Sequence, residues 1–449
     1  MSKTHFKPLF GLDDRPPPFT LALAGFQHLL AVIGGILTAP LIIALGMNLP
    51  IEETSYLLTS ALLISGIATC IQISRFGAIG SGLLSVQGTS FTFIGPILFA
   101  FYSLPELMPA KEKLATILGS CLGAAVVMVF LSYHLERLNR LFTKTVTGVT
   151  VALLGITLVW TTLKNLFKEM SSTSGITETG ILILFSAVVL VVICAMAASK
   201  NLWLRISSIS AGLAAGFILA LSFGKIDFTL LSEMDAWFLP VPFEFGIGFD
   251  WGVFFILLPV FIVSATESIG DLTATCSLSQ LQTKGTEYWR RVRGGVLGDS
   301  INSAIAAVFA TFPNTTFSQN NGVIRLTGIC SRRVGYVVAL LLFTLRLFPV
   351  VAGVFQIIPG VVIYSSTLIM FALVGISGWN ILKSVEQDTR RSWLIAVVAI
   401  LGGWSISLLA KNVELVPEQL NMIIQFPVST GAFLAMILEL VIPGSISKE

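Results

Sequence analysis

The stretch TTFSQNNGVIRLTG, residues 315–328, interrupts the second half of a very apolar sequence. A helix that faces lipid needs about 20 predominantly apolar residues. This stretch instead combines hydroxyls, amides, Gly322 and Arg325. Polar backbone of this kind is tolerated at membrane depth only where it is buried in protein or lines a cavity. The stretch therefore predicts an interrupted span that forms a site.

A related stretch, SVQGTSFTFIGP at residues 85–96, lies in the first half of the chain. Its TSF run at residues 89–91 corresponds to TTF at residues 315–317, an offset of 226 residues (315 − 89) in a chain of 449. Paired interrupted segments at corresponding positions of two halves are typical of the binding site of secondary transporters. We therefore interpret the two stretches as parts of one site.

The composition identifies an integral membrane protein, because 55% of the residues are hydrophobic, 11% are charged and the mean hydropathy is +0.89. A net charge of +3 is too small to indicate a nucleic-acid partner. The five cysteines lie in or beside apolar runs without CxxC spacing, so neither a disulfide framework nor a metal site is expected. Membrane lipid is the expected surrounding.

Fourteen apolar segments follow one another along the chain, and the third and tenth are the interrupted stretches. Two halves of seven segments each run through the membrane in opposite senses, which predicts a 7+7 inverted repeat. The segments are residues 19–45, 54–74, 79–103, 112–134, 145–163, 176–198, 206–223, 251–272, 294–312, 315–328, 334–357, 360–379, 392–410 and 427–446.

Orientation follows from the short loops, because Lys and Arg favour the cytoplasmic side. With a cytoplasmic N-terminus, most basic loop residues fall inside, including Arg390 and Arg391, and fewer fall outside, including Lys164 and Lys168. Residues 1–18 lack the apolar run of a signal peptide and are expected to be a cytoplasmic leader. The chain is predicted to cross the membrane many times, with both termini in the cytoplasm.

Few ionisable residues lie inside the expected spans, and each is a functional candidate because an unpaired charge in lipid is costly. Glu267 and Asp271 lie four residues apart on one helical face. Asp299 opens the ninth span and His28 lies in the first. As alternatives, Asp271 and Asp299 could be solvated or cap a helix, and His28 could be a hydrogen-bond partner between helices.

Buried carboxylates beside a histidine are also typical material of a proton relay. No cluster of carboxylates and hydroxyls indicates a sodium site. The sequence therefore predicts a proton as the coupling ion and no other cofactor, with the carboxylate that carries the proton left open.

Residues in the second interrupted stretch match the signature of a known family. Residues 319–328 fit the signature Q/E/P-N-x-G-x-x-x-x-T-R/K/G through Gln319, Asn320, Gly322, Thr327 and Gly328. The sequence thus resembles the nucleobase-ascorbate transporter family, also called nucleobase:cation symporter-2. The QH, QGTSF, ESIGD and GGVLGD runs are similar to its bacterial xanthine permeases. Two departures are Arg325, where an uncharged residue is expected, and Ser90, where some xanthine transporters have Asn; the role of Arg325 stays open.

The resemblance implies an all-α membrane fold with two domains. A core domain would comprise spans 1–4 and 8–11, residues 19–134 and 251–357. A gate domain would comprise spans 5–7 and 12–14, residues 145–223 and 360–446. Spans 3 and 10 would contain short antiparallel strands that cross at mid-membrane, and a homodimer would form through the gate domains.

The resemblance also implies where a base would bind, between the two strands and span 8. Glu267 would accept from ring N–H groups and Gln319 would hold the other edge, because a carboxylate only accepts whereas an amide also donates. Freed backbone N–H groups at Ser90 and Phe317 would complete the site. Phe91 or Phe317 would stack on the ring. The expected binding residues are Glu267, Gln319, Asn320, Ser90, Phe91, Phe317 and Gln87; Asp271, Asp299 and His28 are expected to serve proton coupling or structure.

The sequence therefore predicts a transporter of the bacterial inner membrane that imports a purine nucleobase, with xanthine preferred, by proton symport and alternating access between core and gate. Uracil, urate, guanine and hypoxanthine stay open as substrates. An enzyme is not expected, since the chain has three histidines and no catalytic constellation. An anion exchanger or channel of this architecture would need uncompensated positive charge at the broken spans, for which Arg325 is the candidate.

Overall fold

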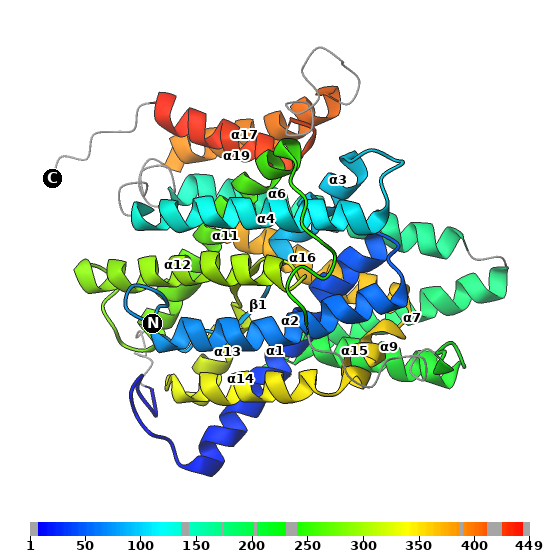
Figure 1. Cartoon of the computed structure of the whole chain (residues 1–449), viewed down its shortest axis with the longest axis horizontal. Coiled ribbons are helices and arrows are strands. Elements are labelled where there is room, and N and C mark those ends of the chain that lie inside the picture. Colours follow the sequence, from blue (N-terminus) through cyan, green and yellow to red (C-terminus); the bar gives the residue numbers. More distant parts are fainter. Residues whose placement is uncertain are drawn as a thin grey trace.

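The structure is a computed structural model that describes residues 8–135, 143–172, 175–201, 204–205, 207–229, 240–385, 389–410 and 424–442. Residues 1–7 of the expected leader and both chain ends therefore lie outside the described residues. The described part is almost entirely helical, with one two-stranded sheet. In Figure 1 the long helices lie side by side, and β1 is near the middle of the bundle.

The first half begins several of its helices at prolines. Pro18 is the first residue of α1, and Pro50 and Pro109 directly precede α2 and α4. Proline is suited to these positions because its fixed φ and missing N–H do not disturb the first turn. The elements are α1 Pro18–Gly46, α2 Ile51–Ser74, β1 Gln87–Thr89, the 3-10 turn η1 Phe91–Phe93, α3 Ile94–Ser103, α4 Ala110–Tyr133, α6 Lys144–Ser171, α7 Ile176–Ala197 and α9 Ser208–Ser222.

The second half follows the same order of elements. Its first helix, α11, is capped by Asp250, whose carboxylate accepts a hydrogen bond from the Val253 N–H at 2.9 Å. The elements are α11 Trp251–Leu278, α12 Thr286–Val308, β2 Asn314–Thr316, α13 Gln319–Thr327, α14 Arg333–Arg346, α15 Pro349–Gln356, α16 Gly360–Lys383, α17 Thr389–Ala410 and α19 Pro427–Val441.

Eight described helices are long and apolar enough to cross a membrane, and there are nine if the bent pair α14 and α15 counts as one span. The fourteen segments expected from the sequence are therefore not all matched by full-length apolar helices. Three further apolar helices are shorter, at residues 91–103, 208–222 and 427–441. Helix α12 is long but polar, because it begins with Glu287 and several arginines and contains Asp299.

The helices contact one another in two sets. In one set, α1, α2 and α4 contact α11, α12 and α14. In the other, α6, α7 and α9 contact α16, while α17 contacts α19 and α6. Helices α6 and α16 approach closely at glycines, because a Cβ on Gly155 would lie 2.2 Å from the Gly375 nitrogen and one on Gly378 2.2 Å from the Ala152 nitrogen. Small residues thus allow two backbones to meet.

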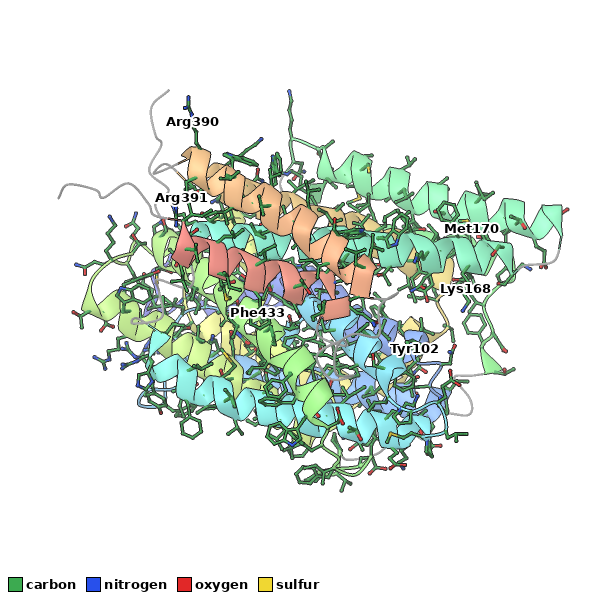
Figure 2. The ribbon with its side chains drawn as sticks, turned by 90° about the horizontal axis from the view of Figure 1, so that it is seen from above. Tyr102, Lys168, Met170, Arg390, Arg391 and Phe433 are labelled. Atoms are coloured by element: carbon green, nitrogen blue, oxygen red, sulfur yellow. The ribbon has the colours of Figure 1, made fainter. Side chains whose placement is uncertain are left out.

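Basic side chains lie at both ends of the helices. Figure 2 shows Arg390 and Arg391 at one end of the molecule, whereas Lys168 and Met170 lie toward the other. Arg391 is tied to the end of α19, where its Nη1 lies 3.0 Å from Glu439 Oε1 and its Nη2 donates to the Glu439 carbonyl at 2.7 Å. This contact fastens the last described helix to α17.

The described part of the leader is packed against the end of α13. The Leu9 N–H donates to the Gly328 carbonyl at 2.7 Å, and the Cys330 N–H donates to the Phe10 carbonyl at 2.9 Å. Arg332 pairs with Asp13 at 2.7 Å. Gly328 has a φ of +71°, the left-handed conformation that ends a helix at least cost in glycine. The signature residue Gly328 therefore ends α13 and receives the leader.

The two interrupted stretches meet in the sheet. Strand β1 pairs antiparallel with β2, in the register Gln87 to Thr316, Gly88 to Thr315 and Thr89 to Asn314. All six residues are buried. The backbone polar groups of both stretches are therefore paired with each other inside the protein, as the absence of water at membrane depth requires.

Candidate functional site

Three carboxylates from two helices surround the sheet. Glu267 and Asp271 lie one turn apart on α11, and Asp299 lies in the middle of α12. Glu267 and Asp271 are half-buried, whereas Asp299 is only 7% exposed. The three groups therefore differ in access as well as in position.

Glu267 is held by a hydroxyl from the first interrupted stretch. Its Oε2 accepts a hydrogen bond from Thr92 Oγ1 at 2.8 Å, and Thr92 belongs to η1. Within the described residues, no other side chain donates to this carboxylate. The second oxygen, Oε1, can therefore accept a hydrogen bond from a ligand.

Asp271 is held by hydroxyls from the second interrupted stretch. Ser318 Oγ lies 2.7 Å from Oδ1 and 2.8 Å from Oδ2, and Thr316 Oγ1 donates to Oδ2 at 3.3 Å. Ser318 and the neighbouring Gly270 are exposed, and a Cβ on Gly270 would meet no atom within 4 Å. Asp271 therefore borders open space.

Asp299 is sealed between helices. Ser268 Oγ donates to its Oδ2, and Gln72 Nε2 donates to its Oδ1 at 3.2 Å. The Ser268 hydroxyl also lies 3.1 Å from Thr315 Oγ1 of β2. Asp299 is thus neither solvated nor a helix cap, and those alternative interpretations are wrong because the residue lies inside α12 against α2 and α11.

Aromatic rings line the other side of the strands. Phe91 and Phe317 are stacked, with ring centroids 6.1 Å apart and planes at 21°, and Phe371 of α16 meets Phe91 edge-on at 6.1 Å. A base stacked between Phe91 and Phe317 would need the two ring planes to be about 7 Å apart, two contacts of ~3.5 Å each, so the rings are too close to hold one between them. Phe317 is only 4% exposed, whereas Phe91 is half-buried. Phe91 is therefore the ring that a ligand can reach in this conformation.

The backbone N–H groups expected to be free are not free. The Ser90 N–H donates to the Pro313 carbonyl at 2.9 Å, and the Phe317 N–H donates to the Val86 carbonyl at 3.1 Å. The expectation that they bind the base is wrong in this structure, because the antiparallel pairing extends one residue beyond each strand and uses both donors. The Ser90 hydroxyl is buried, and it has no hydrogen-bond partner among the described residues.

The three amides expected in the site differ in their surroundings. Gln319 is half-buried at the start of α13. Asn320 is buried and donates from Nδ2 to the Leu84 carbonyl at 2.6 Å, which ties α13 to the loop before β1. Gln87 is buried in β1 near Asp299, without a well-formed side-chain hydrogen bond in the described structure. Gln319 is thus the amide most open to a ligand.

His28 and the remaining signature residues lie further from the open space. The His28 ring is buried in α1 beside Asn320. Thr327 Oγ1 donates to the Val323 carbonyl at 2.9 Å and accepts from the Ile329 N–H at 3.2 Å, so it helps to end α13. Gly322 is half-buried in α13. Arg325 is exposed on α13, and no described acidic side chain forms an ion pair with it.

Several residues of this arrangement were not singled out in the sequence. Thr92, Thr316 and Ser318 lie inside the two quoted polar stretches, and Ser268 lies inside the ESIGD run, so their hydroxyls carried a local signal. Gln72 carried none, because a single amide in an apolar helix is common and its partner is distant in the chain.

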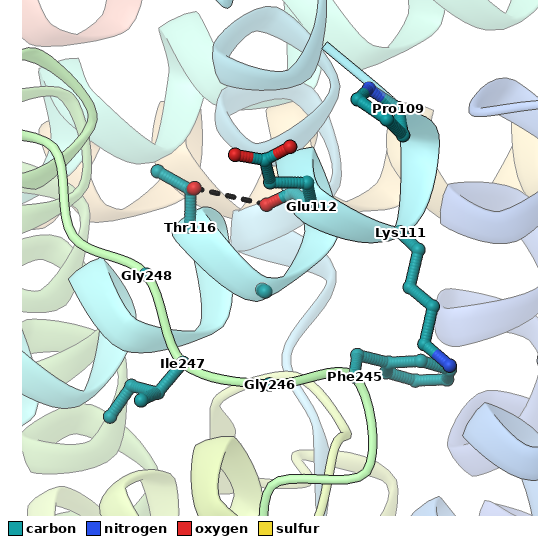
Figure 3. Close-up of a pocket in the computed structure, with 9 residues that line it drawn as sticks. Pro109, Lys111, Glu112, Thr116, Phe245, Gly246, Ile247 and Gly248 are labelled. Atoms are coloured by element: carbon teal, nitrogen blue, oxygen red, sulfur yellow. Dashed lines mark hydrogen bonds between the residues drawn. The ribbon is translucent and has the colours of Figure 1, made fainter.

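A separate cavity of about 430 Å³ lies between the start of α4 and residues 245–248 (Figure 3). Lys111 and Glu112 line it, and the Lys111 ammonium lies 5.8 Å from the centre of the Phe245 ring. None of the carboxylates, amides or rings described above lines this cavity. It is therefore distinct from the candidate site around the sheet.

Comparison with solved structures supports the fold alone. The transmembrane domain of the cyanobacterial bicarbonate transporter BicA aligns with a TM-score of 0.56 at 13% identity, covering 88% of this chain and 98% of that one. Murine Solute Carrier 26 family member A9, an anion transporter in the inward-facing state, aligns with a TM-score of 0.57 at 13% identity, covering 95% of this chain and 69% of that one. The chain therefore has this transporter fold.

Comparison with curated proteins is more specific. The xanthine permease XanP of Escherichia coli (strain K12) is 35% identical over 441 residues, 97% of this chain and 94% of that protein. Xanthine permease XanQ of the same organism is 33% identical over 98% of this chain and 95% of its own length. The uric acid-xanthine permease of Emericella nidulans is 29% identical over 98% of this chain and 84% of that protein.

A family model named Xan_ur_permease and described as "Permease family" matches residues 19–411. This match covers both interrupted stretches and all three carboxylates. Together with the signature residues 319–328, it shows that the chain belongs to this permease family, the nucleobase-ascorbate transporters that include the xanthine permeases.

Proposed function

We propose that this protein imports a purine nucleobase together with protons, and that xanthine is the preferred substrate. The observation that carries the proposal is the geometry of Glu267, which has one oxygen held by Thr92 and the other left for a ligand. The xanthine permeases XanP and XanQ, which are similar over nearly the whole chain, support xanthine. Urate, uracil, guanine and hypoxanthine are the other candidate substrates.

The chemistry of a purine base fits these residues. Its edge alternates N–H donors and C=O acceptors, which suit a carboxylate that only accepts and an amide that both donates and accepts. Glu267 would take a ring N–H and Gln319 would take the opposite edge. The accessible face of Phe91 would stack on the ring, an arrangement that favours flat aromatic ligands.

Asp271 is our candidate for the proton site. It borders open space, and its oxygens accept hydrogen bonds only from hydroxyls. In the described part of the chain no Lys or Arg forms an ion pair with it. A proton can therefore neutralise Asp271 during a transport cycle, and Ser318 and Thr316 can reorient their hydroxyls when it arrives. Asp299 and His28 would support this site from the interior.

The architecture that we propose has fourteen crossing segments in a 7+7 inverted repeat. The helix contacts support it, because they recur when the halves are exchanged. Contacts of α14 with α1 and α2 are matched by contacts of α4 with α11 and α12, and the α7–α9 contact is matched by α17–α19. The two contact sets would be the core and the gate, and movement of one against the other would give alternating access.

We further propose residence in a bacterial inner membrane with both termini cytoplasmic, and a homodimer formed through the gate. The basic ends seen in Figure 2 agree with two membrane surfaces. Mass measurement in a mild detergent checks the dimer. A monomer at every protein concentration would contradict it.

The anion-exchanger alternative shares the fold but not the site. A bicarbonate transporter and a Solute Carrier 26 anion transporter have this fold, but at 13% identity they share the fold alone and do not indicate the substrate of this chain. The groups facing the open space here are carboxylates, which repel anions, whereas Arg325 lies on the exposed side of α13. We therefore favour a base over an anion.

The test is uptake into proteoliposomes. We expect labelled xanthine to accumulate when the outside is more acidic, and accumulation to stop when a protonophore removes the gradient. Unlabelled urate, uracil, guanine and hypoxanthine then compete in the order of their affinities. Uptake of labelled bicarbonate without uptake of any base would overturn the proposal.

A further inference from the structure

Gln72 is a buried amide, and both its nitrogen and its oxygen form hydrogen bonds. It lies near the end of α2 and is fully buried. Its Nε2 donates to Asp299 Oδ1 at 3.2 Å and to the Gly295 carbonyl at 3.3 Å, and its Oε1 accepts from the Ser81 N–H at 3.3 Å. The nitrogen side therefore faces α12 and the oxygen side faces the loop before β1.

The glycines of α12 make room for this amide. A Cβ on Gly298 would lie 2.6 Å from Gln72 Oε1, and a Cβ on Gly295 would lie 3.3 Å from Gln72 Nε2. Any larger residue at position 298 would push the amide out of its place. The GGVLGD run thus provides both the space for Gln72 and the carboxylate that accepts from it.

A chain of hydrogen bonds leads from Gln72 to the candidate site. Asp299 accepts from Ser268 through its other oxygen, and Ser268 lies 3.1 Å from Thr315 of β2. Ser268 directly follows Glu267 in α11. The orientation of the Gln72 amide is therefore linked, through Asp299 and Ser268, to the turn that carries Glu267 and to the strand beside it.

We propose that Gln72 is a positioning residue for transport: its donation to Asp299 keeps that carboxylate an acceptor for Ser268 and so holds Glu267 against β2. The proposal rests on the function proposed above, since it takes Glu267 as the group that binds the base. Gln72 itself touches no substrate. It acts through Asp299, which no other described residue of α2 contacts by a hydrogen bond.

The charges around Asp299 make this donor important. Asp271 of α11 is the acid that faces it, and Arg291 of α12 is held at the Ser81 carbonyl, 3.3 Å away. The charged residues of α2, Glu52 and Glu53, lie in its first turn, at the opposite end from Gln72. Strands β1 and β2 are uncharged, and the charged residues of α4 lie at its start. Within the described residues no cation forms an ion pair with Asp299. Removing the donor therefore leaves a buried oxygen unpaired, which favours uptake of a proton.

The test compares base exchange by purified variants, at the same pH on both sides of the membrane, from mildly acidic to mildly alkaline conditions. Gln72→Glu keeps the size and the acceptor for the Ser81 N–H, but it donates to Asp299 only while it holds a proton. Two carboxyls this close cannot both ionise without repulsion. We expect exchange near the wild-type rate at acidic pH and a loss of about tenfold or more as the pH rises.

Gln72→Met fills the same space but has no donor, so Asp299 takes up a proton more readily as the pH falls. Base exchange by Gln72→Met should therefore be lost at acidic pH, whereas base exchange by Gln72→Glu should be lost at alkaline pH. The matched control is Asn302→Leu, which removes another buried amide between α12 and α2 without adding a carboxyl group. Asn302 donates from Nδ2 to the Ala68 carbonyl at 3.3 Å, and among the described residues no hydrogen bond joins it to Asp299. The control should keep the wild-type pH profile per folded molecule.

Two results would overturn the proposal: wild-type pH profiles in both Gln72 variants, or the same loss of exchange at acidic pH in Asn302→Leu as in Gln72→Met. If Gln72→Glu does not reach the membrane, the profile of Gln72→Met decides. Failure of the proposed function is distinguishable, because then the wild type exchanges no base. In that case the melting temperature still tests the contact between Gln72 and Asp299. The melting temperature of Gln72→Glu should lie below that of the wild type, and the difference should shrink as the pH falls. A difference that does not change with pH would refute the role of this contact.

Discussion

The two interrupted stretches share a backbone plan but differ in chemistry. Each begins with a three-residue strand of the same sheet. The first continues into η1 and the apolar helix α3, IGPILFAFYS, and the second continues into the polar helix α13, QNNGVIRLT. The helix that follows β1 is therefore apolar, whereas the helix that follows β2 carries three amides and an arginine.

The two carboxylates of α11 therefore have different hydrogen-bond donors. Glu267 accepts from Thr92 of the first stretch, and Asp271, one turn away, accepts from Thr316 and Ser318 of the second. Each carboxylate is thus held by hydroxyls from a different half of the chain, although both carboxylates lie on one helix. Neighbouring carboxylates on one helix are therefore held by different halves of the chain, and this is the basis on which we propose different roles for them.

The largest expected effect comes from Glu267→Gln. The change keeps the size but removes the acceptor-only carboxylate, so a ring N–H loses a charge-assisted partner, roughly twice as strong as a neutral hydrogen bond. We expect base uptake to fall to background while the protein still reaches the membrane. The matched variant Thr92→Val removes only the supporting hydroxyl and should weaken binding by about tenfold or less. Near-normal accumulation by Glu267→Gln would remove Glu267 from the site.

Asp271→Asn should instead separate two activities. Base affinity, measured by calorimetry, should stay within about tenfold, a loss under ~1.4 kcal/mol. Uptake against a gradient should collapse, because the amide cannot take up the proton, while exchange of internal for external base should persist. Intact uphill uptake would exclude an essential proton role. Lost binding in a well-folded protein would move Asp271 into the base pocket.

Gly88→Ala tests the strand side of the comparison. A Cβ on Gly88 would lie 2.7 Å from the Phe317 ring and 2.8 Å from Ile36, whereas its partner position in β2 is Thr315. Overfilling of a packed site costs about 1–3 kcal/mol. We expect a lower melting temperature and weaker base binding. The control Gly270→Ala has no atom within 4 Å of the added carbon and should keep or slightly raise the melting temperature, because alanine is more favourable than glycine inside a helix. Equal stability of the two variants would show that β1 and Phe317 adjust freely.

The smallest effect is expected for Glu287→Gln, which breaks a link between the halves outside the sheet. Arg75 of the first half donates to Glu287 at 2.9 Å and thereby lowers the pKa of that carboxyl below its ordinary value. A lowered pKa stabilises the folded state above the ordinary Glu pKa, and this contribution is lost as the pH falls through the lowered value.

An exposed pair contributes at most about 1 kcal/mol. The melting temperature of Glu287→Gln should therefore lie only slightly below that of the wild type at neutral pH, and the gap should close under acidic conditions. A gap that widens with acid would contradict the assigned role of Arg75.

Much of the fold could be predicted from residues close together in the chain. Hydropathy identified a membrane protein, and the polar runs at residues 85–96 and 315–328 located the two strands. The sequence predicts an apolar span at residues 294–312, but α12 begins earlier, at Thr286, and is polar because it includes Glu287, three arginines and Asp299. The freed N–H groups of Ser90 and Phe317 were wrongly expected, since pairing beyond the strand ends depends on register, which no local pattern reports.

The sequence by itself determined the class of protein, its family, and the carboxylates and amides that we propose for the base site, because hydropathy and a ten-residue signature are local properties. Only the tertiary structure decided which hydroxyl holds which carboxylate. Thr92 and Glu267 are 175 residues apart, and Gln72 and Asp299 are 227 apart. Such contacts arise from the association of two halves of the chain, and hydrogen bonds between buried groups depend on that geometry to within a few tenths of an ångström.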